Sequence, residues 1–187
     1  MAVRRCIVIH YTEGASGRSS IDWWKQPQNR QIDLGAHLVI DRDGSIIQCR
    51  AFNRTMSHAG VSRWKDPNTG ILHKNANGYA IGIELANAGN SASVIKAARK
   101  LPGFAGVKTA THRNGGKPAE WEIFPELQVH ACIEACKALV VHYHLDDITG
   151  HDCIAPERKK DPGPLFPMER LREACGFTGL PVISTAP

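Results

Sequence analysis

The sequence Arg5-Cys6-Ile7-Val8-Ile9-His10-Tyr11-Thr12 contains a run of β-branched residues that ends abruptly in polar ones. Apolar side chains at successive positions fit a strand buried on both faces, as in the parallel sheets of α/β proteins. His10 comes at the carboxyl end of this strand, which is the edge of an open α/β sheet where ligands bind. Taken alone, His10 fits a hydrogen-bonded structural histidine better than a metal ligand. The stretch therefore predicts an α/β fold and one candidate site residue.

A second informative segment is the loop Gly150-His151-Asp152-Cys153-Ile154-Ala155-Pro156-Glu157-Arg158-Lys159-Lys160-Asp161-Pro162-Gly163. Its histidine, cysteine and two aspartates are all side chains that bind zinc. Ile148 predicts a short buried strand that ends at His151, and the prolines and Gly163 predict a rigid irregular loop after it. The loop alone fits a solvated surface segment equally well. Its pairing with His10 favours a three-ligand catalytic zinc site formed by His10, His151 and Asp161, with Cys153 as a rival ligand.

A third segment, residues 78–87, alternates as a strand and supplies a candidate base. Glu84 shares one strand face with very small residues, which leave room for a ligand, while the other face is apolar. Burial would raise the pKa of Glu84 towards neutrality, which suits a group that accepts and returns a proton. A solvated glutamate on an edge strand is the alternative, but such a face rarely carries only alanine and glycine otherwise.

These segments, together with residues 36–44 and 57–60, occur in the order seen in zinc-dependent N-acetylmuramoyl-L-alanine amidases. Over residues 5–172 the chain resembles the type 2 amidase family, which shares its fold with peptidoglycan recognition proteins and T7-type lysozyme. Within that family it is similar to the AmpD-like branch. The resemblance implies a single α/β domain with a central mixed β-sheet flanked by helices, spanning residues 1–175. Residues 176–187 are expected to form a mobile tail.

The resemblance also implies the chemistry of the site. It makes His10, His151 and Asp161 the ligands of one Zn²⁺ per chain, Glu84 the general base and acid, and Lys159 the group that stabilises the oxyanion. The bond cleaved would be the amide between the lactyl group of N-acetylmuramic acid and L-alanine. The T7-like branch has a catalytic tyrosine where this chain has Ala36, so no such role is expected there.

Five further residues are candidates for binding peptidoglycan fragments or muropeptides. A tryptophan in a polar loop can stack on a sugar or a peptide, although burial as a loop anchor is equally consistent with Trp64. The planar fork of Arg158 can hold a carboxylate of the stem peptide. The complete set of expected substrate-binding residues is His37, His58, Trp64, Asn77 and Arg158.

Composition is compatible with these expectations. A chain of 187 residues that is 42% hydrophobic suits one domain with one core. No segment is apolar over the roughly 18 residues of a membrane helix, so no membrane insertion is expected. The segment before the first strand has no apolar signal-peptide core, which predicts a cytoplasmic protein or, for a phage enzyme, release by host lysis. Six cysteines in such a chain are expected to be free thiols.

The net charge of +5 fits an anionic partner, and the stem peptides of peptidoglycan carry carboxylates. Nucleic acid is the competing partner, but the basic residues are scattered and no nucleic-acid-binding motif is present. A binding module that holds muropeptides without cleaving them is the main alternative to an enzyme. The presence of all three expected ligands, Glu84 and Lys159 favours the enzyme, and another zinc amide hydrolase on the same scaffold is the remaining alternative.

Overall fold

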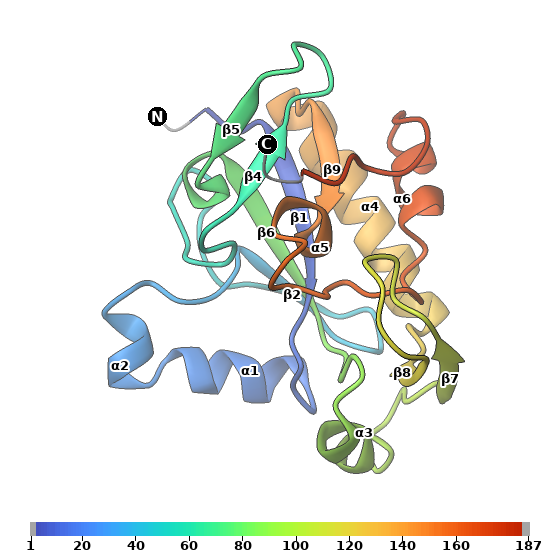
Figure 1. Ribbon diagram of the computed structural model, residues 1–187. Coiled ribbons are helices and arrows are strands. Elements are labelled where there is room, and N and C mark those ends of the chain that lie inside the picture. Colours follow the sequence, from blue (N-terminus) through green and yellow to red (C-terminus); the bar gives the residue numbers. More distant parts are fainter. Residues whose placement is uncertain (1–2, 185–187) are drawn as a thin grey trace.

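The computed structural model describes residues 3–184, and a mixed five-stranded sheet forms its centre (Figure 1). The sheet order is β3-β2-β6-β1-β9, so the first strand in the sequence lies inside it. Strands β2, β6, β1 and β9 run parallel, and β3 pairs antiparallel with β2 at the edge. Their bounds are β1 Cys6–Tyr11, β2 Leu38–Ile40, β3 Ile46–Gln48, β6 Ala80–Leu85 and β9 Asp147–Gly150. The predicted α/β fold with a mixed sheet is confirmed.

The two faces of the sheet are covered differently. Ile7 and Ile9 of β1 lie in the main core with α4 (Glu126–Tyr143) and α6 (Met168–Ala174). Cys6 and Val8 point the other way, into a smaller cluster that includes residues of β4 (Arg63–Lys65) and α5 (His151–Ile154). Figure 1 shows α5 in front of the sheet and α4 behind it. Because side chains alternate along a strand, His10 and Glu84 belong to the face that carries α5.

Helix α1 (Gly17–Trp24) follows β1 and stands apart from the sheet together with α2 (Pro27–Arg30) (Figure 1). Ser16 caps α1 in a capping box with Ser19, which satisfies orphan backbone donors of its first turn. The segment before α1 is anchored by Arg42, whose Nη1 donates to the carbonyl of Ala15 at 2.6 Å. Arg42 is itself held by a buried bidentate pair with Glu122, at 2.6 and 2.9 Å. This network fixes where α1 begins.

The sequence did not predict several small elements. Between β3 and β6 lie the hairpin of β4 and β5 (Leu72–Lys74) and the short 3₁₀ helix η1 (Ala76–Gly78). Further along lie α3 (Ala92–Ala98) and the hairpin of β7 (Val107–Ala110) and β8 (Ala119–Glu122). These elements are short, so neither a helical nor a strand period is long enough to detect.

The segment 176–184 lies against the domain. The backbone nitrogen of Ser184 donates to the carbonyl of Cys153 at 2.8 Å, and its hydroxyl accepts from the backbone of Lys65 at 3.2 Å. The mobility expected for the tail and the domain boundary at residue 175 stay predictions. Residues 185–187 of that tail lie outside the described part of the chain.

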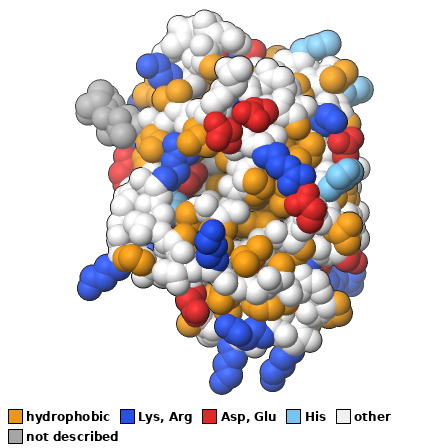
Figure 2. Space-filling model, turned by 90° about the vertical axis from the view of Figure 1, so that its right-hand side faces the viewer, with side chains coloured by type: hydrophobic (Ala, Val, Ile, Leu, Met, Phe, Trp, Pro, Cys, Tyr) orange, Lys and Arg blue, Asp and Glu red, His pale blue; other side chains and the backbone are white. Residues whose placement is uncertain are grey.

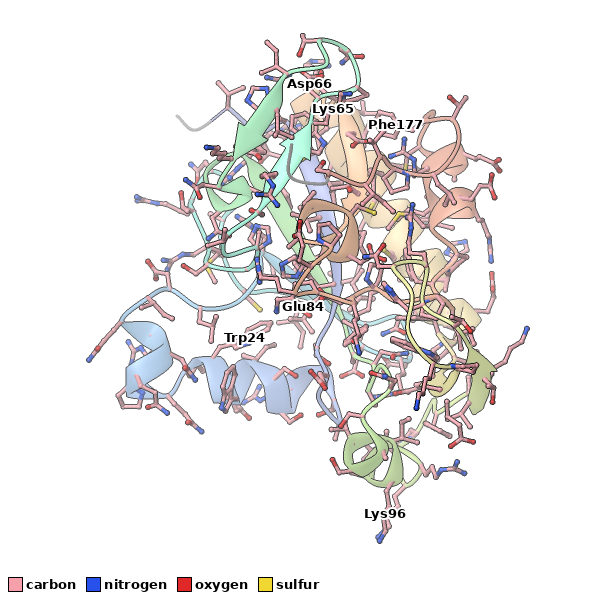
Figure 3. All side chains as sticks on the ribbon, viewed as in Figure 1. Trp24, Lys65, Asp66, Glu84, Lys96 and Phe177 are labelled. Carbon is pink, nitrogen blue, oxygen red and sulfur yellow. The ribbon has the colours of Figure 1, made fainter. Side chains whose placement is uncertain are left out.

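Acidic and basic side chains are interspersed over the face shown in Figure 2, with basic side chains gathered at its lower end. Helix α3, which carries Lys96, lies at the lower end of the molecule (Figure 3). Within residues 3–184, no helix is long and apolar enough to cross a membrane. All six cysteines are free thiols.

Candidate metal and catalytic site

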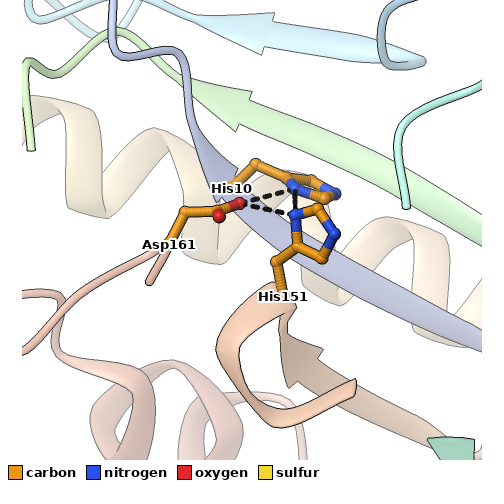
Figure 4. A group of neighbouring side chains, drawn as sticks. All are labelled: His10, His151 and Asp161. Atoms are coloured by element: carbon orange, nitrogen blue, oxygen red, sulfur yellow. Dashed lines mark hydrogen bonds and ion pairs between the residues drawn. The ribbon is translucent and has the colours of Figure 1, made fainter. Parts of the chain in front are cut away.

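Three side chains from distant parts of the sequence converge at one point (Figure 4). The Nδ1 atom of His10 lies 2.9 Å from Nδ1 of His151 and 2.8 Å from Oδ2 of Asp161. The same oxygen of Asp161 lies 2.9 Å from Nδ1 of His151. Each of the three side chains is buried, so these atoms form a compact polar group that is shielded from bulk solvent.

Neighbouring strands bring these residues together. Parallel pairing of β1 with β9 sets Ile9 opposite Gly150, so His10 at the end of β1 lies close to His151, which begins α5. The loop after α5 brings Asp161 back beside the start of this helix, where the backbone nitrogen of Asp152 donates to the carbonyl of Asp161 at 2.7 Å. The site therefore lies at the carboxyl end of parallel strands, as expected for an α/β sheet.

The donor set fits a zinc ion. Two imidazole nitrogens and one carboxylate oxygen leave a fourth position open, as in catalytic zinc sites. Zinc ligands lie about 2.0–2.2 Å from the metal, so the edges of the tetrahedron are roughly 3.3 Å. The observed separations of 2.8–2.9 Å mean that the atoms would move apart by only about half an ångström.

The second nitrogen of each histidine ring also has a partner. Nε2 of His151 lies 3.0 Å from the carbonyl oxygen of Ala59, and Nε2 of His10 lies 3.0 Å from Nδ1 of His58. A metal on both Nδ1 atoms would place the protons on Nε2, so His151 would donate to Ala59 and His10 to His58. Such outer partners fix ring orientation and tautomer in metal sites. His58 thus acts on the candidate site through His10.

A glycine makes room for His58. A Cβ atom at Gly82 would lie 2.6 Å from Cγ of His58, closer than real Cβ contacts. The sequence suggested that small residues beside Glu84 leave space for a ligand. At Gly82 this space is filled by the His58 ring, and the reason for glycine is the second partner of His10.

The charge states of the cluster also suit a metal cation. Burial, followed by the neighbouring His151, lowers the pKa of His10 to about 4, so its ring is neutral at neutral pH. Burial would raise the pKa of Asp161, but His151 and His10 outweigh it and hold the pKa well below its usual range. Neutral imidazoles and an ionised carboxylate are the forms that bind zinc.

Glu84 lies on β6, directly opposite His10 on β1 in the parallel register. Burial, followed by the charge of Asp161, raises its pKa to about 8, while Lys159 acts in the opposite direction. Its Oε2 atom is buried and has no hydrogen-bond partner within residues 3–184. A carboxyl group of this kind can take up and release a proton near neutral pH.

These groups open onto a cleft of about 520 Å³. His58, Arg158 and Lys159 line it together with the three candidate ligands and Glu84. Arg158 is already held by backbone, since its Nε donates to the carbonyl of Val61 at 2.9 Å and its Nη2 contacts the carbonyl of Ala59. Lys159 is half-buried and near enough to influence the pKa of both His10 and Glu84.

Three of the residues expected to contact the substrate do not line this cleft. Trp64 is 2% exposed, and its Nε1 donates to the carboxylate of Asp147 at 2.8 Å, so it is a loop anchor. His37 is fully buried; its Nδ1 accepts from the backbone of Gly82 and its Nε2 lies 2.8 Å from the carbonyl of Arg54. Both rings are buried and form hydrogen bonds inside the protein, and neither residue lines the cleft.

Asn77 also has a structural place. Its Oδ1 accepts from the backbone nitrogens of His58 and Ala59, at 3.1 and 2.7 Å, so it holds the 58–60 loop rather than lining the cleft. Cys153, the rival ligand, is turned away from the cluster, with its thiol 3.3 Å from Oδ1 of Asp152 and burial raising its pKa to about 12. In the described residues, the group able to bind a metal consists of His10, His151 and Asp161.

Among the cleft-lining residues that sequence reasoning missed are Trp23 and Trp24 on α1. Trp23 is 52% exposed, which is unusual for so large an apolar side chain. The signal was present as a tryptophan pair at the end of a short polar helix. Its importance became visible only when α1 was placed across from Glu84, towards which Trp24 points in Figure 3.

Two histidines at the ends of sheet strands, an aspartate of the following loop and a nearby glutamate share one open cleft, which is an arrangement compatible with a metal-dependent hydrolase. Comparison with known proteins gives the family. Residues 2–164 match the model of the N-acetylmuramoyl-L-alanine amidase family, and the chain belongs to this family.

Individual relatives agree with this assignment. The chain is 33% identical over 118 residues to N-acetylmuramoyl-L-alanine amidase AmiD of Escherichia coli, a match that covers 62% of this chain and 33% of the relative. It is 29% identical over 143 residues to 1,6-anhydro-N-acetylmuramyl-L-alanine amidase AmpD of Citrobacter freundii, covering 75% of this chain and 57% of the relative. The chain thus spans less than two thirds of the length of these relatives.

Solved structures share the fold. The structure of AmiD from E. coli, in complex with the substrate anhydro-N-acetylmuramic acid-L-Ala-D-γ-Glu-L-Lys, superposes with a TM-score of 0.69 at 26% identity. The match covers 96% of this chain and 59% of that one. AmpDh3 from Pseudomonas aeruginosa has a TM-score of 0.68 at 23% identity, with 96% and 61% covered. This second likeness concerns the fold alone.

Proposed function

We propose that the chain hydrolyses the amide bond between the lactyl group of N-acetylmuramic acid and L-alanine in peptidoglycan fragments or muropeptides, with one Zn²⁺ bound per chain. The observation that carries this proposal is the convergence of His10, His151 and Asp161 beside Glu84 in one cleft. Membership of the amidase family supports the choice of bond. The muramyl peptide bound by the AmiD relative supports the substrate class.

In this proposal, His10, His151 and Asp161 hold the metal. When bound, zinc lowers the pKa of a water molecule from 15.7 to about 7 and polarises a carbonyl group. Glu84 accepts the proton of the attacking water and gives it to the amide nitrogen as that nitrogen leaves. Its pKa, raised to about 8, suits both transfers because near neutral pH the group is mostly the acid that returns the proton, while the ionised form that accepts it is still within easy reach.

Lys159 stabilises the negative charge that develops on the carbonyl oxygen. Its side chain lies on the wall of the cleft and carries a positive charge close to Glu84 and His10. A preorganised donor of this type typically contributes a factor on the order of 10²–10³ to turnover. The amine product departs as L-alanine with a free amino group at the head of the stem peptide.

A module that only binds muropeptides is the alternative. Such a protein has no use for a buried carboxyl group with an unpartnered oxygen beside three metal-binding side chains, because each buried polar group without a partner costs free energy. Glu84 therefore favours an enzyme.

The test measures newly formed amino groups when the zinc-loaded protein is mixed with purified muropeptides, beside Glu84→Gln and a zinc-free sample. Amine release by the zinc-loaded wild type alone is the expected result. If all three samples bind muropeptides equally and none releases amine, the protein is a binding module and the amidase proposal is wrong.

A further inference from the structure

Two hollows meet at Glu84, and they differ in charge. The first is the cleft of the metal site, with Arg158, Lys159 and Lys160 along one wall. The second, of about 410 Å³, lies between α1 and the start of α3. It shares part of its lining with the first, namely Thr12, Glu13, Trp23, Trp24 and Glu84. No lysine or arginine of residues 3–184 lines this second hollow, whereas serine hydroxyls do, at positions 19, 20 and 91.

We propose that this second hollow, whose described lining has no basic side chain, is the sugar subsite, where Trp23 and Trp24 pack against the apolar face of the muramyl ring. The proposal rests on the proposed function and fixes the direction in which the substrate lies. The bond to be cut has a neutral sugar on its acyl side and a peptide with carboxylates on its amine side. The carboxylates then lie along the wall of Arg158 to Lys160 and the sugar lies on the tryptophan side of Glu84.

The chemistry of the second hollow supports a neutral occupant that carries hydroxyl groups. Its two acids, Glu13 and Glu84, also line the first cleft, so among the described residues the two hollows differ in that only the first has basic side chains to pair with the carboxylates of a stem peptide. Hydroxyl groups both donate and accept hydrogen bonds, so serine side chains can pair with the hydroxyls of a sugar. A flat aromatic side chain offers a large apolar surface to the C–H face of a ring.

Trp24 is held in place for such a role. A Cβ atom at Gly35 would lie 2.8 Å from Cε3 of Trp24, and Gly35 has a φ of +128° that other residues rarely adopt. The indole therefore lies directly on glycine backbone, with the Cε atom of Met56 close by. Trp24 borders both hollows, and Figure 3 shows its side chain pointing from α1 towards Glu84. Trp23, 52% exposed, extends this surface towards solvent.

The test uses a matched pair of substrates, a muramyl peptide and the same lactyl peptide without its sugar. We expect Trp24→Ala to raise KM for the muramyl peptide by about tenfold, equal to about 1.4 kcal/mol, and to leave the sugarless substrate unchanged. Trp23→Ala is expected to act in the same direction and Trp23→Phe to restore most of the effect. Asp22→Ala is the control, because Asp22 is exposed on the same helix and lines neither hollow.

If Trp24→Ala raises KM equally for both substrates, or for neither of them, the sugar subsite is overturned. A second measurement separates this failure from failure of the proposed function. Saturation-transfer NMR with the methyl ester of N-acetylmuramic acid, which lacks the free carboxylate, is expected to show binding to the wild type and to Asp22→Ala but not to Trp24→Ala. If the wild type cleaves neither substrate, the amidase proposal fails. The NMR result then decides the subsite by itself, and absence of sugar binding to the wild type overturns it.

Discussion

Replacing Gly82 by alanine is expected to weaken zinc binding although Gly82 is not a ligand. The new Cβ atom would lie 2.6, 2.8 and 3.0 Å from Cγ, Nδ1 and Cδ2 of His58. His58 cannot stay in place, because such contacts are shorter than real Cβ contacts. A shift of about 1 Å would lengthen the 3.0 Å contact between His58 and Nε2 of His10 beyond hydrogen-bonding distance.

The size of the effect follows from the role of outer partners in metal sites. Losing such a partner typically lowers metal affinity by about 10–100-fold, or roughly 1.4–2.7 kcal/mol. The measurement is competition for zinc with a chromophoric chelator. Gly78→Ala is the matched control, since nothing lies within 4 Å of a Cβ atom there and its φ is not in the left-handed region.

A double-mutant cycle sharpens this test. If Gly82→Ala acts through His58, the variant that also carries His58→Ala should bind zinc as weakly as His58→Ala alone, because the two changes remove one interaction. Zinc affinity of Gly82→Ala equal to that of the wild type and of Gly78→Ala would refute the role of His58. Fully additive losses would show that Gly82 acts by another route.

Four further predictions concern the same machinery. Lys159→Ala should fold and bind zinc but lose a factor on the order of 10²–10³ in kcat; near-normal turnover would remove it from the mechanism. Glu84→Gln should keep zinc and lose activity, whereas loss of zinc on dialysis would make Glu84 a ligand. The raised pKa of Glu84, about 8 against 4.5, means that the native protein retains a proton that the unfolded chain releases, so stability falls as pH rises between those values. Urea unfolding without zinc should accordingly show that Glu84→Gln has a free energy of unfolding about 2 kcal/mol above that of the wild type at pH 8, and no difference at pH 4. This gain is smaller than the full pKa difference would give, because the cleft admits water. Equal stability of the two proteins at pH 8 would contradict the burial of this carboxyl group. Arg42→Met should lower the free energy of unfolding by about 3 kcal/mol because it strands buried Glu122, and an unchanged urea midpoint would show that the pair is not needed.

The sequence predicted the parts of the molecule whose signals are local. The apolar run of β1 and the alternation around Glu84 each encode a strand and its faces. Ile81 and Ile83 lie in the main core and Ala80 on the other side, as their alternation indicated. The convergence of His10 with the 150–163 loop followed from their places at strand ends. Their roles as zinc ligands, like those of Glu84 and Lys159, stay predictions.

The remaining residues could not be placed because their environment is set by tertiary contacts. Trp64 and His37 have the side chains of a binding site, and only the packing of Asp147 and Gly82 against them shows that they are structural. Trp24 is the opposite case, because it lines the cleft although a tryptophan on a short helix gives no sign of this in the sequence. Its partner surface, Gly35, belongs to a loop whose φ of +128° is not encoded in any periodicity.

The central claim is that this chain cuts one particular amide bond with the help of a metal held by His10, His151 and Asp161. Mass spectrometry of muropeptides digested in ¹⁸O-labelled water by the zinc-loaded protein, beside a chelated sample, tests it most directly. The account predicts a stem peptide with a free L-alanine amino terminus and a muramic acid product carrying one ¹⁸O in its lactyl carboxylate, both absent after chelation. Intact muropeptides, label in any other fragment, or cleavage that survives chelation would contradict it.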